Sequence, residues 1–378
     1  MNRFISKEDS TALKGVAILW MIFHHLYHQT ALFDYLNLNF YPFKTDDVLN
    51  LGIYAKVCVA IFAFVSGYGL YISYRAFAKK YVAKGSVVLF ESNVPTTRWI
   101  FERLKKLMCT FATLASLSYI YFAIKSYFTG EEFFSKYGDT ISERVINIAA
   151  DIGGISKLLD TRSLNGAWWY ISAAIIFVVI APMIYSLLHK YGSIFVMGVI
   201  IVLPRILKLD YFGQTSIYVY MEVFAVGMVA AHADWFGRFE KRFCSNLLSQ
   251  VITFAVLIAF WVLTIHNNIL LSRSVYWEYH YIVVPLVNIF LCVCFIFKLN
   301  FVKSFFAFMG KYSTIMWLTH IFFRNMINSI IPENTHFIAL FVILTLVSLA
   351  FAVLYEYVHD LIFDNRKENG KKQMRHDL

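Results

Sequence analysis

The sequence is poor in charge. Charged residues make up 15% of its 378 positions, whereas soluble domains carry about a quarter. Hydrophobic residues make up 59% and aromatic residues 18%, a composition that suits lipid-facing and interfacial surfaces. An ordinary soluble protein is therefore excluded. No stretch is long enough for a separate soluble domain, so we expect one membrane domain over residues 1–365 and a basic cytoplasmic tail over 366–378.

The chain also lacks the marks of a processed or repetitive protein. The first apolar run carries His24 and His25 and has no small-residue cleavage site after it, so we expect no cleavable signal peptide. No internal repeat or low-complexity tract is visible, and few Pro or Gly residues interrupt the apolar runs at their centres. These absences weigh against a transporter made of two repeated halves with broken helices.

Apolar runs dominate what is present, and ten of them have about the length that spans a membrane. The runs lie at 13–32, 52–74, 107–128, 167–188, 193–209, 215–232, 248–266, 280–297, 304–330 and 337–362. The fifth, which ends at Pro204 and Arg205, is the shortest. We predict an all-α fold: a polytopic membrane helix bundle of about ten transmembrane helices.

Basic residues gather in alternate connections. Residues 75–106, between the second and third runs, carry eight Lys or Arg against Glu91 and Glu102. The positive-inside rule then predicts both termini on the cytoplasmic side of a multi-pass protein of the plasma (inner) membrane. The net charge of +10 is thus mainly a topology signal with anionic lipid as its partner, and we expect no nucleic-acid partner.

The five cysteines give little information. Four fall within apolar runs and one on the expected inner side: Cys58, Cys109, Cys292, Cys294 and Cys244. None lies in an expected outward loop, so no disulfide framework is indicated. Cys292 and Cys294 are two positions apart and face different directions on a helix, which argues against a metal pair. We expect no metal ion.

The first apolar run contains ionisable residues at unusual depth. Lys14 and His25 are eleven positions apart. At about 100° per residue they share a helix face to within roughly 20°, about 16 Å apart along the axis. Ionisable groups inside a bilayer are costly unless they face a polar interior, so this face is a candidate functional site.

The run from Lys14 to His25 resembles the opening signature of the acyltransferase-3 family of bacterial membrane acyltransferases, in which Arg or Lys precedes a histidine by eleven positions. Four later segments are similar to family motifs in the same order: 61–68, 102–107 with Arg103 and Lys106, 168–171, and 310–313 continuing to His320. Lys106 stands where the family commonly has a second arginine, and Lys cannot replace a bidentate Arg. The resemblance covers nearly the whole chain and implies the same ten-span fold.

The resemblance implies that His25 is the general base of acyl transfer. Histidine suits this role because its ordinary pKa of about 6.5 allows it to accept a proton near neutral pH. The alternative is a neutral histidine packed in the bundle with one hydrogen bond. His24 lies about 100° round the helix from His25, where it either supports His25 or shares its role. His320, in the late motif, is a candidate second polar residue of the site.

A coenzyme A donor carries a pyrophosphate and a 3′-phosphate, which require cations at a cytoplasmic mouth. Arg103 and Lys106 are three apart and share a helical face, and Lys14 lies at the same membrane level. We expect these three to bind acyl-CoA, with acetyl-CoA the simplest donor and no permanently bound cofactor. Simple anchoring by the positive-inside rule is the alternative.

Other polar and aromatic positions leave their roles open. Ser66 beside Gly67 is either a nucleophile acylated by CoA or, as we favour, one of two small residues that let helices approach, with a hydrogen bond in the site. Trp168 and Trp169 are either interfacial anchors or a stacking platform for a sugar acceptor. Glu222, at mid-span, requires a partner, either a histidine or a cation, and is a candidate catalytic group.

The expected reaction moves an acyl group from cytoplasmic acyl-CoA to a hydroxyl of a cell-surface glycan or its lipid-linked precursor. Many family members carry an appended SGNH esterase-like domain, which we do not expect here, so transfer ends within the bundle or in a separate extracytoplasmic partner. Substrate choice is expected in the loop at 129–166. Two other classes stay open: a proton-coupled transporter or flippase, and a non-catalytic acyl-CoA or glycan binder. Arg205 and Arg324 lie nearer the expected outer surface, where solvation is usual.

Overall fold

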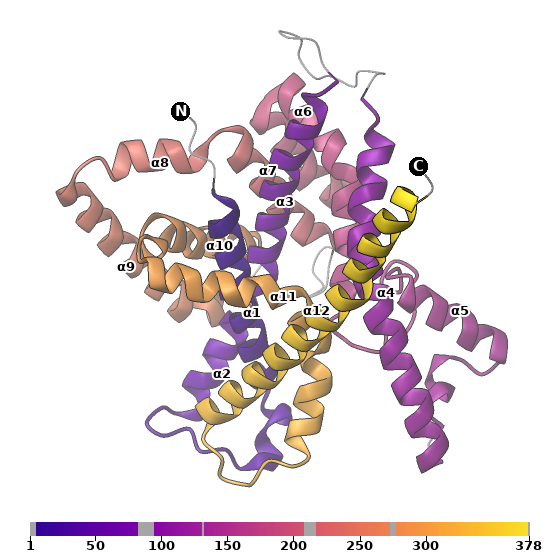
Figure 1. Cartoon of the computed structure of the whole chain (residues 1–378). Coiled ribbons are helices and arrows are strands. Elements are labelled where there is room, and N and C mark those ends of the chain that lie inside the picture. Colours follow the sequence, from indigo (N-terminus) through magenta and orange to yellow (C-terminus); the bar gives the residue numbers. More distant parts are fainter. Residues whose placement is uncertain (1–4, 82–93, 131, 208–216, 273–276, 377–378) are drawn as a thin grey trace.

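The computed structural model describes residues 5–81, 94–130, 132–207, 217–272 and 277–376, and their elements are helical (Figure 1). The α-helices are α1 Lys7–Tyr27, α2 Thr45–Tyr54, α3 Val57–Ala78, α4 Thr96–Thr129, α5 Ile141–Ile152, α6 Trp169–Ile206, α7 Ile217–His232, α8 Trp235–Phe243, α9 Leu247–Ser272, α10 Trp277–Cys294, α11 Asn300–Asn328 and α12 Phe337–His376. The only β-type pairing in the described residues is an isolated bridge between Asn39 and His336. The all-α prediction is confirmed. The domain boundary expected at residue 365 falls inside α12.

Among the described residues, six helical stretches are long and apolar enough to cross a membrane, or seven when α7 and α8, bent by 65°, are counted as one broken span. This establishes a multi-pass helical membrane protein, with fewer spans by this measure than the ten expected. Part of the difference is that the fourth and fifth expected spans, which both fall within Trp169–Ile206, count as one. Ionisable side chains also keep α1 and α11 outside the count.

The fourth and fifth expected spans fall within α6. Its backbone leaves helical geometry at Gly192, where φ is 80° and ψ is 173°. A positive φ of this size suits glycine, which has no β-carbon to clash with the backbone. The two expected spans are therefore two helical segments joined at one residue.

Helix α1 lies at the centre of the arrangement and packs most extensively against α11. It begins at a capping box in which Ser6 and Asp9 satisfy each other's backbone N–H groups. Where the two helices cross, Gly15 faces the Phe306 carbonyl and Gly310 faces the Thr11 carbonyl. A β-carbon on either glycine would overlap these carbonyls, so the crossing depends on both residues.

Helices α3 and α7 cross in the same way. Gly67 faces the backbone of Phe224, and Gly227 faces the backbone of Phe64. A β-carbon on Gly227 would lie 3.0 Å from the Tyr68 nitrogen. The favoured interpretation of the Ser66–Gly67 pair as a point of close helix approach agrees with this geometry.

The segment expected as the loop 129–166 contains a helix of its own. Thr140 caps α5 by accepting a hydrogen bond from the Glu143 N–H, and the Glu143 carboxylate accepts from the N–H groups of Asp139 and Thr140. These bonds lower the pKa of Glu143. Figure 1 shows α5 at the edge of the molecule beside α4. The segment thus provides an ordered surface outside the main bundle.

Candidate active site

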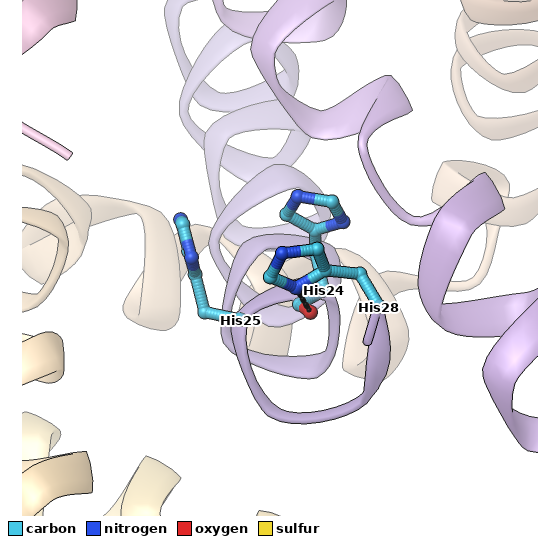
Figure 2. Close-up of side chains that lie close together, drawn as sticks. All are labelled: His24, His25 and His28. Carbon is cyan, nitrogen blue, oxygen red and sulfur yellow. Dashed lines mark hydrogen bonds between the residues drawn. The ribbon is translucent and has the colours of Figure 1, made fainter. Parts of the chain in front are cut away.

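Histidine rings gather where the end of α1 meets α11. The ring centroids of His24 and His25 are 5.1 Å apart, and those of His25 and His320 are 4.9 Å apart. His28 stacks on His24 with a centroid distance of 4.3 Å. Figure 2 shows the rings at the end of α1, with His24 and His28 over one another and His25 to one side. Three residues singled out from the sequence, His24, His25 and His320, therefore lie together.

Backbone carbonyls orient two of these rings. His24 Nδ1 lies 2.8 Å from the Gly52 oxygen, and His28 Nδ1 lies 2.7 Å from the His24 oxygen. A carbonyl oxygen only accepts, so each Nδ1 donates its proton. In the neutral tautomer, each Nε2 then carries a lone pair. Gly52 is itself tightly placed, because a β-carbon there would lie 2.9 Å from the His28 nitrogen.

His320 is completely buried in α11. Its Nδ1 lies 2.8 Å from the Trp317 oxygen and 3.2 Å from the Met316 oxygen, so Nδ1 donates. Its Nε2 is buried and has no hydrogen-bond partner among the described residues. A buried lone pair without a partner costs free energy, and groups of this kind in native structures often belong to functional sites.

Two cationic residues adjoin the histidines. The Arg324 guanidinium donates to the His25 backbone carbonyl over 2.9 Å. Lys56, which precedes α3, lies within electrostatic range of His24 and His28. The expectation that Arg324 is solvated was wrong, because its side chain is partly buried against α1. Its position could have been found from the sequence, since Arg324 follows His320 by four residues and shares its helix face.

The expected donor-binding residues form a second group. Lys14 and Lys106 lie within electrostatic range of each other. Arg103, one turn before Lys106 on α4, donates to the Ser73 hydroxyl and lies over the Trp99 ring at 5.7 Å from its centroid. The three basic residues thus belong to one region, and Lys14 shares the unbroken helix α1 with His25.

The structure separates the predicted roles of the two neighbouring tryptophans. Trp168 is 1% exposed, and its Nε1–H donates to the Leu318 carbonyl over 3.0 Å. Asn165 Nδ2 donates to the same oxygen over 3.1 Å. Trp168 is therefore neither an interfacial anchor nor an open stacking platform; it ties α6 to α11 two residues before His320. Trp169 is partly exposed, with its ring centroid 5.4 Å from that of Tyr220.

Ser66 is partly buried on α3 and lies beside the Tyr170 hydroxyl. The ring contacts of His25 within the described residues come from α1 and α11, and Ser66 is not among them. The polar neighbour that the structure gives to Ser66 is thus the Tyr170 hydroxyl.

Glu222 is completely buried in α7, and its Oε1 lies 3.0 Å from Nη1 of Arg205. The sequence left open whether a histidine or a cation balances this carboxylate, and the structure shows that a cation, Arg205, does so. Arg205 also donates to the Ile201 carbonyl, and its side chain is 33% exposed. Arg205 is thus partly solvated and at the same time balances the charge of Glu222. The ion pair links Glu222 on α7 to Arg205 on α6.

The segment 129–166 contains a cavity of about 390 Å³. Its lining is polar with one aromatic ring: Ser135, Lys136, Tyr137, Gly138, Asp139, Asn147, Asp160, Thr161 and Arg162. Burial and the nearby Arg162 guanidinium lower the pKa of Lys136. Burial raises the pKa of Tyr137 to about 12. Two cations, Lys136 and Arg162, thus share a partly desolvated cavity with the carboxylates of Asp139 and Asp160, so its lining offers charged partners of both signs.

Comparison with known proteins agrees with the membrane helices and the histidine group described above. A family model described as an acyltransferase domain matches residues 8–357. The match covers most of the chain, and the protein belongs to this acyltransferase-3 family. It is a multi-pass membrane acyltransferase. No curated protein and no solved structure matches the chain significantly.

Proposed function

We propose that this acyltransferase moves an acyl group, most simply acetyl, from cytoplasmic acyl-CoA to a hydroxyl of a cell-surface glycan or its lipid-linked precursor at the plasma (inner) membrane. His25 is the general base. The observation that carries the proposal is the meeting of His25 and His320 at 4.9 Å, with Lys14 on the same helix face as His25.

The proposed step is a direct transfer. The acceptor oxygen attacks the thioester carbonyl while His25 removes the hydroxyl proton. A carbon–oxygen bond forms and the carbon–sulfur bond breaks. The departing CoA sulfur then takes the proton from the His25 imidazolium, which leaves free CoA, the ester and a neutral histidine. We assign Ser66 no covalent role and place it instead beside the Tyr170 hydroxyl.

The donor is proposed to enter from the side of Lys14, Arg103 and Lys106, which bind its phosphates. Lys14 and His25 are about 16 Å apart along a helix that rises 1.5 Å per residue. The extended pantetheine arm of CoA has a comparable length. The thioester can therefore reach His25 while the phosphates stay at the basic group.

Neighbouring groups position the base. Arg324 fixes the backbone of His25 through the carbonyl contact at 2.9 Å, and we assign its cation to stabilising the negative charge that develops on the thioester oxygen. His24 is held by Gly52 and packs against His25. We assign His28 no part in the reaction, and we assign Glu222 to the stability of the α6–α7 pair rather than to catalysis.

The acceptor is proposed to bind first at the cavity of the segment 129–166. Asn147 and the carboxylates of Asp139 and Asp160 offer the hydrogen-bonding groups that sugars require, and Tyr137 offers a ring. Lys136 and Arg162 can pair with an acidic group or a phosphate of the acceptor, while the two carboxylates accept from its hydroxyls. Asn165 and Trp168, at the end of this segment, bond to Leu318 on α11, which links the cavity to the histidine group.

The test of the reaction class is the product. Purified full-length protein in nanodiscs is given acetyl-CoA labelled in the acetyl group and an envelope glycan fraction, and glycan-bound label is measured after mild base treatment. The proposal predicts base-labile label on the glycan and an equal amount of free CoA. Free CoA without glycan label would show hydrolysis alone, and intact acetyl-CoA with glycan movement across the bilayer would favour the transporter.

A further inference from the structure

The sequence from His24 to His28 contains a metal-chelating pattern that the proposed reaction does not use. His24 and His28 are four residues apart, so they share one face at the end of α1. Two histidines at this spacing form the helical half of many zinc sites. His25 lies beside them, and one ring nitrogen from each of the three lies within 4.8 Å of the others.

The hydrogen bonds of this group suit metal binding. His24 and His28 both donate Nδ1–H to backbone carbonyls, those of Gly52 and His24. In metal sites the non-ligating ring nitrogen is held in this way, which fixes the tautomer and directs the other nitrogen to the ion. Both Nε2 atoms are therefore prepared as ligands without any change of tautomer.

The distances and the ring planes require an adjustment before an ion binds. Zinc binds imidazole nitrogen at about 2.0–2.1 Å in a tetrahedral arrangement, which places ligand nitrogens about 3.4 Å apart. The observed upper limit of 4.8 Å exceeds this by about 1.4 Å. The rings of His24 and His28 stack at 4.3 Å between centroids with 24° between their planes (Figure 2). Because the lone pairs lie in the ring planes, at least one ring must turn to another rotamer before both nitrogens point at one ion.

The charges around the group define which ion and which affinity to expect. The three ligands are neutral imidazoles, which favour zinc and similar transition metals over magnesium or calcium. Lys56 and Arg324 add positive charge beside them. This charge weakens the binding of a dication and favours an anion, such as hydroxide or chloride, as the fourth ligand.

We propose that His24, His25 and His28 bind one zinc ion, and that the bound ion inhibits acyl transfer. A coordinated His25 nitrogen has no lone pair with which to accept the hydroxyl proton. The inhibition rests on the proposed function, whereas the binding does not. The expectation of no metal was drawn from the cysteines and did not consider these histidines.

The binding test uses the full-length protein after chelator treatment, with Co²⁺ as a spectroscopic probe and zinc measured by elemental analysis. We expect one equivalent per chain and a tetrahedral Co²⁺ absorption band that zinc abolishes. His28→Gln should weaken binding at least tenfold. The matched control is His189→Gln, a histidine on α6 whose Nδ1 also contacts a carbonyl, that of Tyr185. Equal binding by the His28 and His189 variants, or no stoichiometric binding by the native chain, would overturn the proposal.

The inhibition test is separate. Zinc should inhibit CoA release by the native chain reversibly, with recovery on adding chelator, and magnesium should not. His28→Gln should keep the uninhibited rate and require at least tenfold more zinc for half inhibition. Unchanged zinc sensitivity in this variant contradicts the inhibitory role. If no CoA release is found in any variant, the proposed function fails, and the Co²⁺ spectrum still decides the metal site.

Discussion

Gly15 of α1 and Gly310 of α11 face each other so closely that a β-carbon on Gly310 would lie 2.9 Å from the Gly15 nitrogen. The two residues are far apart in the sequence, and their contact brings together the helices that carry His25 and His320. The glycines are thus part of the site although neither has a side chain. Their place in the family motifs has a physical reason, since backbone contact between helices excludes larger residues.

Gly310→Ala is expected to separate α1 from α11. Overpacking of this kind costs about 1–3 kcal/mol, so we expect a lower unfolding temperature in detergent and a lower rate of CoA release. The matched control is Gly69→Ala, because a β-carbon at Gly69 meets no atom within 4 Å. If both variants unfold and turn over alike, the crossing does not position the site.

Arg324→Ala is expected to reduce kcat more than it raises KM for acetyl-CoA. The variant loses the bond to the His25 carbonyl, and hydrogen bonds to charged groups contribute about 1.5–3 kcal/mol. If that energy is expressed in the transition state, the rate falls roughly 10- to 150-fold. Arg324→Lys should recover part of the rate because it keeps a cationic donor. A native kcat in the alanine variant would show that Arg324 does not position His25 for the reaction.

Much of this site follows from sequence, and the rest depends on long-range packing. Lys14, His25 and His320 could be identified because their depth and motif positions are local properties. The burial of Trp168 could not, because it is set by Leu318, 150 positions away. Arg324 was identifiable in principle from its spacing to His320.

The junction between the fourth and fifth expected spans and the partner of Glu222 also depend on packing that the sequence does not show. The sequence gives two apolar runs on either side of Gly192, but only the structure shows that the two helical segments of α6 are joined at this one residue. The depth of Glu222 predicted that a partner exists, but identifying Arg205 required the α6–α7 contact. Local spacing thus predicted elements and candidate groups, and packing decided which of them meet.

Trp168→Phe should destabilise the protein mildly and Trp168→Ala severely. The phenylalanine variant keeps ring packing and loses the hydrogen bond to Leu318, worth about 1 kcal/mol. The alanine variant also creates a cavity, which costs about 3–5 kcal/mol. Thermal unfolding in detergent measures both. If Trp168 were an open sugar platform, the phenylalanine variant would instead unfold like the native protein and lose acceptor affinity.

Lys136→Ala and Arg162→Ala are expected to raise KM for the glycan acceptor without changing KM for acetyl-CoA. Each removes one cation from the cavity, and an exposed or partly buried charge contact is worth about 1 kcal/mol, or several-fold in affinity. Lys157→Ala is the control, since Lys157 belongs to the same segment and does not line the cavity. Unchanged acceptor kinetics in the double variant would place acceptor binding elsewhere.

Glu222→Ala should destabilise the fold by about 1–3 kcal/mol, because it leaves a partly exposed arginine without its carboxylate. Glu102→Ala is the comparison: its pair with Arg98 is exposed, and such pairs contribute about 1 kcal/mol or less. The folded fraction of Glu222→Ala should release CoA at close to the native rate. A large loss of kcat in folded Glu222→Ala would instead indicate that Glu222 takes part in catalysis.

The most direct test of the account is the release of free CoA thiol from acetyl-CoA by purified protein in nanodiscs with a glycan acceptor fraction. Native protein is compared with His25→Ala and with His189→Gln, a histidine variant outside the site. The account predicts that His25→Ala folds, binds CoA and loses at least a hundredfold in rate, while His189→Gln keeps the native rate. Equal CoA release by native protein and folded His25→Ala would contradict the assignment of His25 as the base.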